Sequence, residues 1–498
     1  MFKIKRLDLL LGLSAIALYL VTRLYNIMSL PMFTDEAIYT RWSQIARFDA
    51  NWRFISLTDG KQPSFVWIDM ILMRFTHDPL LAGRLVSVFA GFLSLVGIYF
   101  LAKELFGKRV GIIASFLYIL YPFSLVYDRM ALYDSLVAAG AIWSLFFEIL
   151  LIKKKRLDIA LILGMVFGVS VLTKSSGFLF IYLLPFSLLL FDFKNKNRKE
   201  LFTRWAVLAV ISAALAYFYY SIIKLSPFAH IVDEKNSTFV YPLKEWIGHP
   251  FRFFVGNWSG MWDWLVKYAT IPTLLLVASS FFIEKKKTLD KLLLFSWFIL
   301  PFIALSLFGK VLYPRFILFM TMPLLILAAY SLNEFLKRIK PGFGKVIIFS
   351  AFVIAMVFSD FLILHNFQNS PIPFSDLEQY INGWPAGGGT KEIINYLDKE
   401  SKKGKIYVAS LGTFGSLPTY AIEIYLGDNK KIEKGGIYPV PSQIPKDLLE
   451  KAKTMPVFLF VSSQSEFEEQ IKTWPIHEIL RYKKGVGNSY SHLYEVKI

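Results

Sequence analysis

The sequence predicts a polytopic, all-helical membrane protein with interfacial helices in its first outer loop and a small soluble α/β domain near its C-terminal end. Three observations predict this fold. Apolar runs recur that are long enough to cross a bilayer, which takes about 20 residues each. Charged residues make up only 18% of the chain, against about a quarter in soluble proteins. From about Asn369 onward the composition becomes that of a soluble domain.

The apolar runs predict about eleven transmembrane helices. The first, at about 7–28, is longer than the core of a signal peptide and no small-residue cleavage site follows it, so we expect a retained span. The other ten predicted spans lie at about 80–102, 110–127, 132–152, 158–173, 177–192, 204–223, 268–283, 292–308, 315–336 and 345–364.

Basic residues recur on alternate loops between these runs, from Lys3–Arg6 to Lys337–Lys345. The positive-inside rule places those loops and the N-terminus in the cytoplasm of a multi-pass protein of the cell membrane. The outer loops at 29–79 and 224–267 and the C-terminal domain are then extracytoplasmic. Within the first outer loop, helical stretches at 36–48 and 64–75 are suited to lie in the membrane interface.

The change in composition divides the chain into a transmembrane domain at 1–368 and an α/β domain at 369–498. In the second domain we expect strands at 405–411 and 456–462 and helices near 391–402 and 464–472. Three glycines, 387–389, precede the first of these helices, a place where backbone amides can cradle a phosphate. They lack the G-x-G-x-x-G spacing, so a plain loop with Thr390 as the helix cap is favoured.

Composition also excludes several kinds of site. The chain has no cysteine, which excludes disulfides, thiolate catalysis and cysteine metal sites. Its six histidines are scattered, so a histidine-built zinc site is not expected. The net charge of +18 is concentrated in short loops and no basic groove with interleaved aromatics is present, so we expect no nucleic-acid partner.

Charged side chains are costly inside a membrane, so their positions are informative. The middles of the predicted spans carry almost none. Charged residues gather instead at the outer ends of the spans, from seven or more distant parts of the sequence, which predicts one site at the outer leaflet. They are Arg23, Asp35, Glu36, Lys61, Arg84, Asp128, Arg129, Asp134, Lys174, Lys310 and Arg315.

The carboxylates among them have two interpretations. Asp35 and Glu36 follow the first span and are candidates to accept a proton from a hydroxyl, although Thr34 or Asp35 would equally serve to start a helix. Asp134 can likewise cap its helix, and Asp128 with Arg129 can form a surface ion pair of little value. Two carboxylates and an arginine are also suited to hold a sugar, an acceptor or a divalent ion.

The cations are suited to a lipid-linked phosphate. Lys61 lies in a Gly-Lys-Gln-Pro segment, Lys174 in a short turn between two spans, and Arg315 directly after Tyr313 and Pro314. Cations at this depth can neutralise a phosphate as it departs. Single residues of this kind often only reach towards lipid headgroups, but as a group, with so few charges elsewhere in the spans, they favour a site.

Taken in order, these segments resemble a known family. An acidic pair after the first span, Gly60-Lys61-Gln62-Pro63, an arginine at the head of the next span, Arg129 before Leu132-Tyr133-Asp134, Leu172-Thr173-Lys174 and Pro314-Arg315-Phe316 follow one another. This set is similar to the GT-C glycosyltransferases of the protein O-mannosyltransferase and aminoarabinose-transferase type, over about residues 8–340. The segment 379–387 also resembles one in bacterial and archaeal members. Gln62 stands where relatives commonly have a second proline, and Ser175-Ser176 where many have Gly-Pro.

The resemblance implies roles for these residues. Asp35 matches the catalytic carboxylate of the first loop and Asp134 the second acidic position, with Glu36 beside them as a further catalytic candidate. Lys61, Lys174 and Arg315 match positions associated with the lipid-phosphate donor, and Arg84 matches a structural or phosphate-proximal arginine. We predict that Asp128, Arg129, Lys310 and Tyr313 bind substrate as well.

The implied reaction is an inverting transfer of a sugar from a polyprenyl-phosphate carrier to a hydroxyl of a protein, lipid or glycan, outside the cytoplasm. No nucleotide is needed, and the chemistry does not demand a metal ion, so we expect no cofactor. Two alternatives stay open. A lipid-linked oligosaccharide ligase or polymerase uses related donors. A secondary transporter would place ionisable groups near the midplane of repeated halves, which this sequence does not show.

Overall fold

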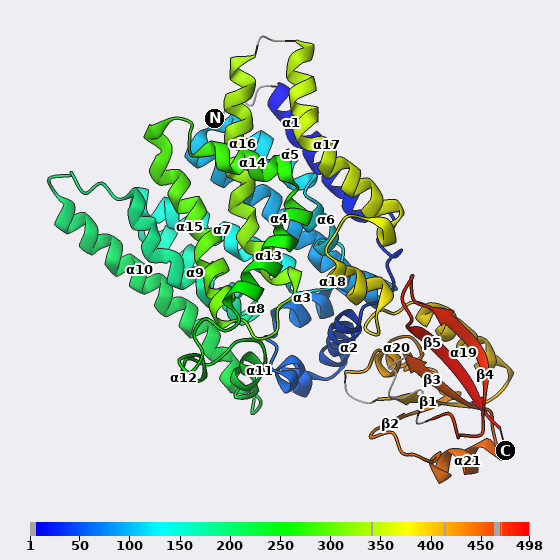
Figure 1. Cartoon of the computed structure of the whole chain (residues 1–498). Helices are drawn as coiled ribbons and strands as arrows, with labels where there is room; N and C mark the ends of the chain where they lie inside the picture. The colour runs from blue at the N-terminus through cyan, green and yellow to red at the C-terminus, as the bar shows by residue number, and fades with distance from the viewer. Residues whose placement is uncertain (1–5, 340–341, 413–414, 463–468, 470, 498) are drawn as a thin grey trace. The chain divides into compact units, whose positions relative to one another are not determined.

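The computed structural model describes residues 6–339, 342–412, 415–462, 469 and 471–497 (Figure 1). The chain folds into two compact units. The first contains Met1–Tyr25, Asn51–Ile68 and Arg84–Pro373, and the second contains Asn26–Ala50, Asp69–Gly83 and Phe374–Ile498. Lys3 and Lys5, and most of the helix predicted at 464–472, lie outside the described residues.

The first unit is almost entirely helical. Its helices are α1 (Arg6–Leu24), η2 (Ile55–Asp59), α5 (Lys108–Ile119), α6 (Pro122–Tyr127), α7 (Asp134–Lys154), α8 (Leu157–Thr173), α9 (Phe178–Leu183), η4 (Leu184–Leu190), α10 (Arg198–Tyr220), α11 (Ile231–Phe239), α12 (Leu243–Trp246), α13 (Phe254–Ala269), α14 (Ile271–Ser280), α15 (Thr288–Phe308), η7 (Pro314–Ile317), α16 (Leu318–Arg338) and α17 (Phe343–His365). The boundary between the units falls within α3 (Ser64–Leu72) and α4 (Pro79–Phe106).

This architecture agrees with the predicted fold class. Within the described residues, six helices are long and apolar enough to cross a membrane, and four shorter apolar helices accompany them. Each of the eleven predicted ranges coincides with helical structure, although the number of spans stays a prediction. The range 110–127 is divided into α5 and α6 because Pro122 cannot continue the hydrogen bonds of α5.

Helix α16 is central to the first unit. It contacts α5, α7, α14 and α15, and 94% of its apolar window is buried by protein. Only 22% of the corresponding window in the segment Arg198–Leu225, which includes α10, is buried, although its mean hydropathy is higher. An apolar helix that is left uncovered by protein is suited to face lipid, so burial separates the inner helices from the outer ones.

Two glycines allow α8 to pack closely on α10. A Cβ at Gly164 would meet Leu215 at 2.9 Å, and one at Gly168 would meet the Tyr219 ring at 2.6 Å. The close approach also lets Ser212 Oγ on α10 donate to the carbonyl oxygen of Ala160 on α8, at 2.8 Å. Small residues four apart are a common way to bring membrane helices together, because van der Waals contact replaces the hydrophobic effect there.

The second unit is built on a five-stranded sheet with the order β2-β1-β3-β5-β4. Strand β1 (Ile406–Leu411) pairs in parallel with β2 (Ile432–Ile437) and β3 (Val457–Ser462), whereas β5 (Tyr490–Val496) pairs antiparallel with β3 and β4 (Ile476–Lys483). Strands β1 and β3 are buried on both faces. Strands of this kind lie in the middle of a layered α/β domain.

Helices cover both faces of this sheet. On one face, α19 (Thr390–Lys403) and α20 (Leu417–Leu426) supply residues such as Leu397 and Ile422 to a core with Val408 and Phe460. On the other face, α21 (Lys446–Ala452) packs Leu448 against the opposite side chains of β1 and β3. The α/β prediction is thus confirmed.

The predicted strands at 405–411 and 456–462 match β1 and β3, and the helix at 391–402 matches α19. The prediction that Thr390 caps α19 is wrong. Gly389 is the N-cap, with φ of +83°, and no side chain makes the cap hydrogen bond. Glycine adopts this left-handed conformation without the steric penalty that threonine would meet.

Helix α2 (Thr34–Phe48) of the first loop belongs to the second unit and packs on α20. Arg41 Nε donates to Glu423 Oε2 at 2.7 Å, and Gln44 Nε2 donates to the carbonyl oxygen of Ile424 at 3.2 Å. A loop near the start of the chain and the C-terminal domain therefore share one folding unit.

Candidate functional site

Three of the predicted cations lie against a run of aromatic rings in the first unit, and Lys310 is joined to the same segment. The Lys61 ammonium lies 4.9 Å from the centre of the Phe239 ring, and the Lys174 ammonium lies 4.5 Å from the centre of the Phe316 ring. The two rings are themselves 5.9 Å apart, edge to face. Segments that are more than 100 residues apart in sequence thus bring two lysines to neighbouring rings.

The same run of rings continues to Arg315, and the ammonium of Lys310, which is nearby in the sequence, lies 5.2 Å from the centre of the Tyr241 ring. Tyr313 contacts Phe316 with ring centres 5.6 Å apart, and the Arg315 guanidinium lies 4.8 Å from the Tyr313 ring centre. The backbone N–H of Lys310 donates to the carbonyl oxygen of Phe239 at 2.8 Å. We refer to Lys61, Lys174, Lys310 and Arg315 together as the cation cluster.

Asp134 contributes a carboxylate to this cluster. It occupies the first turn of α7, is only 5% exposed, and accepts a hydrogen bond from Lys174 Nζ at 2.7 Å. A carboxylate is favourable at this end of a helix. Asp134 therefore orients Lys174.

A polar bond ties the turn of Lys61 to the turn of Lys174. Gln62 Nε2 donates to Ser175 Oγ at 2.7 Å. Gln62 and Ser175 are two of the three positions at which the sequence departs from the usual pattern of the family that it resembles. Both residues differ from that pattern, and the hydrogen bond between them joins the two turns.

Asp128 lies in a second, deeper group. It is 1% exposed and accepts hydrogen bonds from Arg23 Nε at 3.3 Å, Tyr118 Oη at 3.0 Å and Ser135 Oγ at 2.9 Å. Burial raises the pKa of Asp128 to about 6, against the lowering effects of Arg23, Ser135 and Tyr118. The sequence allowed a surface ion pair between Asp128 and Arg129. In the structure, Asp128 pairs with Arg23 instead.

Arg129 and Arg84 belong to this deeper group. Arg129 Nη1 donates to the carbonyl oxygen of Thr22 at 2.8 Å, and Arg84 is fully buried. Burial lowers the pKa of Arg129 to about 10, and the positive charges of Arg23 and Arg84 add to the effect. Arg129 therefore remains a cation at neutral pH, held among like charges by a backbone carbonyl.

Asp35 and Glu36 lie in the second unit, in the first turn of α2. Glu36 is fully buried, and its Oε2 accepts a hydrogen bond from the backbone N–H of Phe33 at 3.0 Å, which is the helix-capping interaction of an acidic residue at this position. Asp35 is partly exposed. Of the two carboxylates, Glu36 is engaged in building the helix terminus, whereas Asp35 keeps access to solvent.

The segment that carries Asp35 is attached to the C-terminal domain. Both the N–H and the Oγ1 of Thr34 donate to the carbonyl oxygen of Pro385, at 3.0 and 2.8 Å. Phe33 forms a β-bridge with Ala386 and packs edge to face on Tyr380. The start of α2 is thereby fixed by residues about 350 positions later in the chain.

Sequence reasoning missed the rings of Phe239 and Phe316 and the pairing of Arg23 with Asp128. The rings carry no signal of their own in a chain that is 17% aromatic. Arg23 did give a signal, as a cation at the end of the first span, but its partner is 105 residues away. Within the described residues, no three histidine or acidic side chains form a group that could hold a metal ion.

Comparison with known proteins agrees with the fold. Residues 60–223 match the family of dolichyl-phosphate-mannose-protein mannosyltransferases. No curated protein sequence is a significant match. The segment matched by the family includes Lys61, Arg84, Asp128, Asp134 and Lys174.

Solved structures are similar over most of the chain. ArnT from Cupriavidus metallidurans bound to undecaprenyl phosphate has a TM-score of 0.59 at 14% identity, covering 98% of each chain. The Archaeoglobus fulgidus oligosaccharyltransferase tethered to an acceptor peptide has a TM-score of 0.58 at 14% identity, covering 93% of this chain and 70% of its own. The mycobacterial arabinofuranosyltransferase AftD gives 0.52 at 12% identity, over 99% of this chain and 42% of its own.

These similarities extend across both units, and the sequence match includes two members of the cation cluster, Lys61 and Lys174. The chain therefore has the GT-C fold of membrane glycosyltransferases and carries, at residues 60–223, the sequence pattern of the dolichyl-phosphate-mannose-protein mannosyltransferase family.

Proposed function

We propose that this protein is an inverting glycosyltransferase that moves a sugar from a polyprenyl-phosphate carrier to a hydroxyl acceptor on the extracytoplasmic face of the cell membrane. The observation that carries the proposal is the cation cluster, in which Lys61, Lys174 and Arg315 lie against one run of aromatic rings. A phosphate monoester departing from a sugar gains negative charge, and fixed cations stabilise it as it leaves.

The rings make these cations more effective. A lysine or arginine over an aromatic face is held by the quadrupole of the ring without losing all its hydrogen-bond donors. Within the cluster, Lys174 Nζ donates to Asp134 Oδ1 at 2.7 Å, which fixes the position of this cation. A group of lysines and an arginine at one place is suited to a lipid phosphate.

The proposed reaction is a single displacement. The acceptor oxygen attacks the anomeric carbon, the bond from that carbon to the phosphate oxygen breaks, and polyprenyl phosphate leaves with the electron pair. The acceptor proton passes to Asp35, which we assign as the base because it is partly exposed while Glu36 caps α2. Lys174, oriented by Asp134, and Arg315 bind the phosphate. We expect no metal ion to take part.

The test is transfer of radiolabelled sugar from a panel of polyprenyl-phosphate sugars by the purified full chain in detergent, with host envelope extract as acceptor. Label moving with the wild type but not with Asp35→Asn supports both the reaction and the base. Equal transfer by Asp35→Asn refutes the base. No transfer from any donor by a folded protein refutes the reaction.

A second candidate is transfer of a whole oligosaccharide, which the similarity to the archaeal oligosaccharyltransferase supports. The same assay separates the two functions when a polyprenyl-pyrophosphate oligosaccharide is added to the donors. Transfer from that donor alone favours the second candidate.

A further inference from the structure

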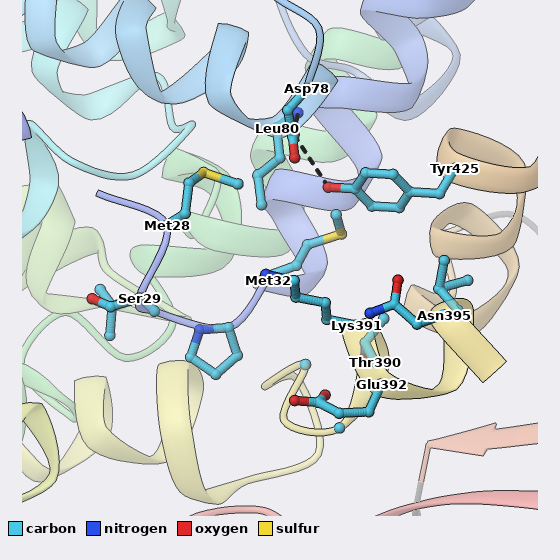
Figure 2. A pocket seen from close by; sticks show the side chains of 15 residues that line it. Met28, Ser29, Met32, Asp78, Leu80, Thr390, Lys391, Glu392, Asn395 and Tyr425 are labelled. Atoms are coloured by element: carbon cyan, nitrogen blue, oxygen red, sulfur yellow. Dashed lines mark hydrogen bonds between the residues drawn. The ribbon is translucent and has the colours of Figure 1, made fainter. Parts of the chain in front are cut away.

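A cavity of about 330 Å³ lies within the second unit (Figure 2). One wall is the segment Met28–Met32 of the first loop, and another is the residues at the start of α4, Asp78 and Leu80. The third wall comes from the first turns of α19 and from Tyr425 at the end of α20. The volume is at the lower end of the range for ligand sites, which is ~300–1,000 Å³.

The cavity presents apolar and polar groups together. Met28, Met32 and Leu80 give it an apolar side, while Glu392 and Asn395 project from α19 with their carboxylate and amide groups exposed (Figure 2). Neither of these two side chains makes a hydrogen bond to another described residue. Their donors and acceptors are therefore available to a ligand.

Tyr425 is held in position across the cavity. Its hydroxyl donates to Asp78 Oδ1 at 3.3 Å, and the same oxygen accepts the backbone N–H of Leu80 at 2.9 Å (Figure 2). The phenol ring is thus fixed by the cap of α4. An aromatic ring held beside amide and carboxylate groups offers both an apolar face and hydrogen bonds to one ligand.

The start of α19 adds an unpartnered hydroxyl. Thr390 lines the cavity and is 4% exposed, and its Oγ1 has no hydrogen-bond partner in the described part of the chain. It lies next to Gly387, where an added Cβ would come within 3.3 Å of Oγ1. Buried hydroxyls are almost always bonded, so one that is not indicates a missing partner.

Charge decides which class of ligand fits. The N-terminus of α19 and Lys391 would favour an anion, but the carboxylates of Glu392 and Asp78 line the same cavity. Two carboxylates against one lysine disfavour a phosphate, and the apolar side chains disfavour an ion of either sign. A neutral ligand with many hydroxyls satisfies every group present.

We propose that this cavity binds a neutral hexose unit of a glycan acceptor, as a subsite that holds the acceptor away from its reacting hydroxyl. The inference rests on the proposed function for the role of Asp35. Met32 lines the cavity and lies three residues before Asp35, so the two Cα atoms are at most ~11 Å apart. A short oligosaccharide spans that distance.

Direct binding tests the inference without any donor. Isothermal titration of the full chain in detergent with mannobiose and maltose should give saturable binding of at least one of them. Asn395→Ala and Glu392→Gln should each weaken it by ~10-fold, which corresponds to the loss of one hydrogen bond of ordinary to charged strength. Lys399→Ala is the matched control, since Lys399 is exposed on the same helix and does not line the cavity.

Several outcomes would overturn the inference. The first is that neither disaccharide binds, and the second is that all variants bind equally. The third is that inorganic phosphate or a Ser/Thr-containing peptide binds more tightly than the disaccharides and that the same variants weaken this binding. The proposed function is tested separately. Binding without transfer supports the cavity and refutes the transferase, whereas transfer without binding refutes only the cavity.

Discussion

Thr34 donates two hydrogen bonds to a single acceptor, the carbonyl oxygen of Pro385, with N–H and Oγ1 at 3.0 and 2.8 Å. The residue after Thr34 is the proposed base, and the residue after Pro385 forms a β-bridge with Phe33. The C-terminal domain is therefore more than an accessory module attached to a membrane enzyme. It holds the loop on which Asp35 lies.

Thr34→Val should lower the rate constant of transfer more than it lowers stability. The variant loses the Oγ1 bond but keeps the N–H bond, so α2 still forms, while the position of Asp35 becomes less defined. A displacement of ~1 Å can lower a rate by up to ~100-fold. Turnover and melting temperature measured on the same preparation check this.

Thr40→Val is the matched control for this prediction. Thr40 is fully buried on the same helix, and its Oγ1 has no hydrogen-bond partner among the described residues. Removing that hydroxyl should leave turnover unchanged. Equal losses of turnover in the two variants would show that α2 does not tolerate valine. This result would contradict the positioning role of Thr34.

Lys174→Met should reduce kcat/KM for the lipid-linked donor by ~100-fold or more, in line with the loss of one group that stabilises a developing anion. The variant also leaves the buried carboxylate of Asp134 without its cation. Lys153→Met is the control, because Lys153 is on α7, the helix that carries Asp134, and pairs with Glu104 at 3.0 Å. If both variants lose activity equally, the effect comes from the helix rather than from phosphate binding.

Lys484 predicts a dependence of stability on pH. It is fully buried, and its Nζ donates to the carbonyl oxygen of Trp384 at 2.9 Å and to Ser462 Oγ at 2.7 Å. Burial lowers the pKa of Lys484 to about 7, whereas in an unfolded chain it is ~10.4. Between these values the unfolded state binds more protons, so this lysine makes stability rise with pH.

The measurement is the melting temperature of the full chain from about pH 5.5 to about pH 9.5 for the wild type and Lys484→Met. The melting temperature of the wild type should rise relative to that of the variant as the pH rises above 7, and the difference between them should level off below pH 7. Parallel profiles would show that Lys484 titrates normally.

Chelation should leave transfer unchanged. The displacement proposed above uses lysine and arginine to stabilise the leaving group, so a divalent ion has no required task. Activity measured with EDTA, and again after adding Mg²⁺ or Mn²⁺, checks this expectation. A loss with EDTA that either ion restores would show that the carboxylates hold a metal.

The sequence predicts the two regions of this fold well, because their signals are local. Long apolar runs determine the helices, and short apolar runs determine β1 and β3. It does not predict that α2 shares a folding unit with the sheet, since the contacts of Thr34 with Pro385 join residues 351 positions apart. Strand β2 contains Gly435 and Gly436 and has one buried residue, Ile432, so it gives no clear strand signal.

The candidate site shows the same limit. The cost of burying charge indicates that Lys61, Lys174 and Arg315 share one depth in the membrane. Which rings they lie against is decided by tertiary packing of Phe239 and Phe316, and no local pattern marks those two among the many phenylalanines of the chain. The roles assigned to these residues stay predictions until the variants are measured.

The second unit is assembled from three separate stretches, of which Asn26–Ala50 is made first and Phe374–Ile498 last. During synthesis the stretch with Asp35 is therefore complete more than 300 residues before the last stretch of its unit begins. The bonds from Thr34 to the carbonyl oxygen of Pro385 can form only after that. On the proposed function, Asp35 is thus positioned for catalysis only once the C-terminal domain has been made.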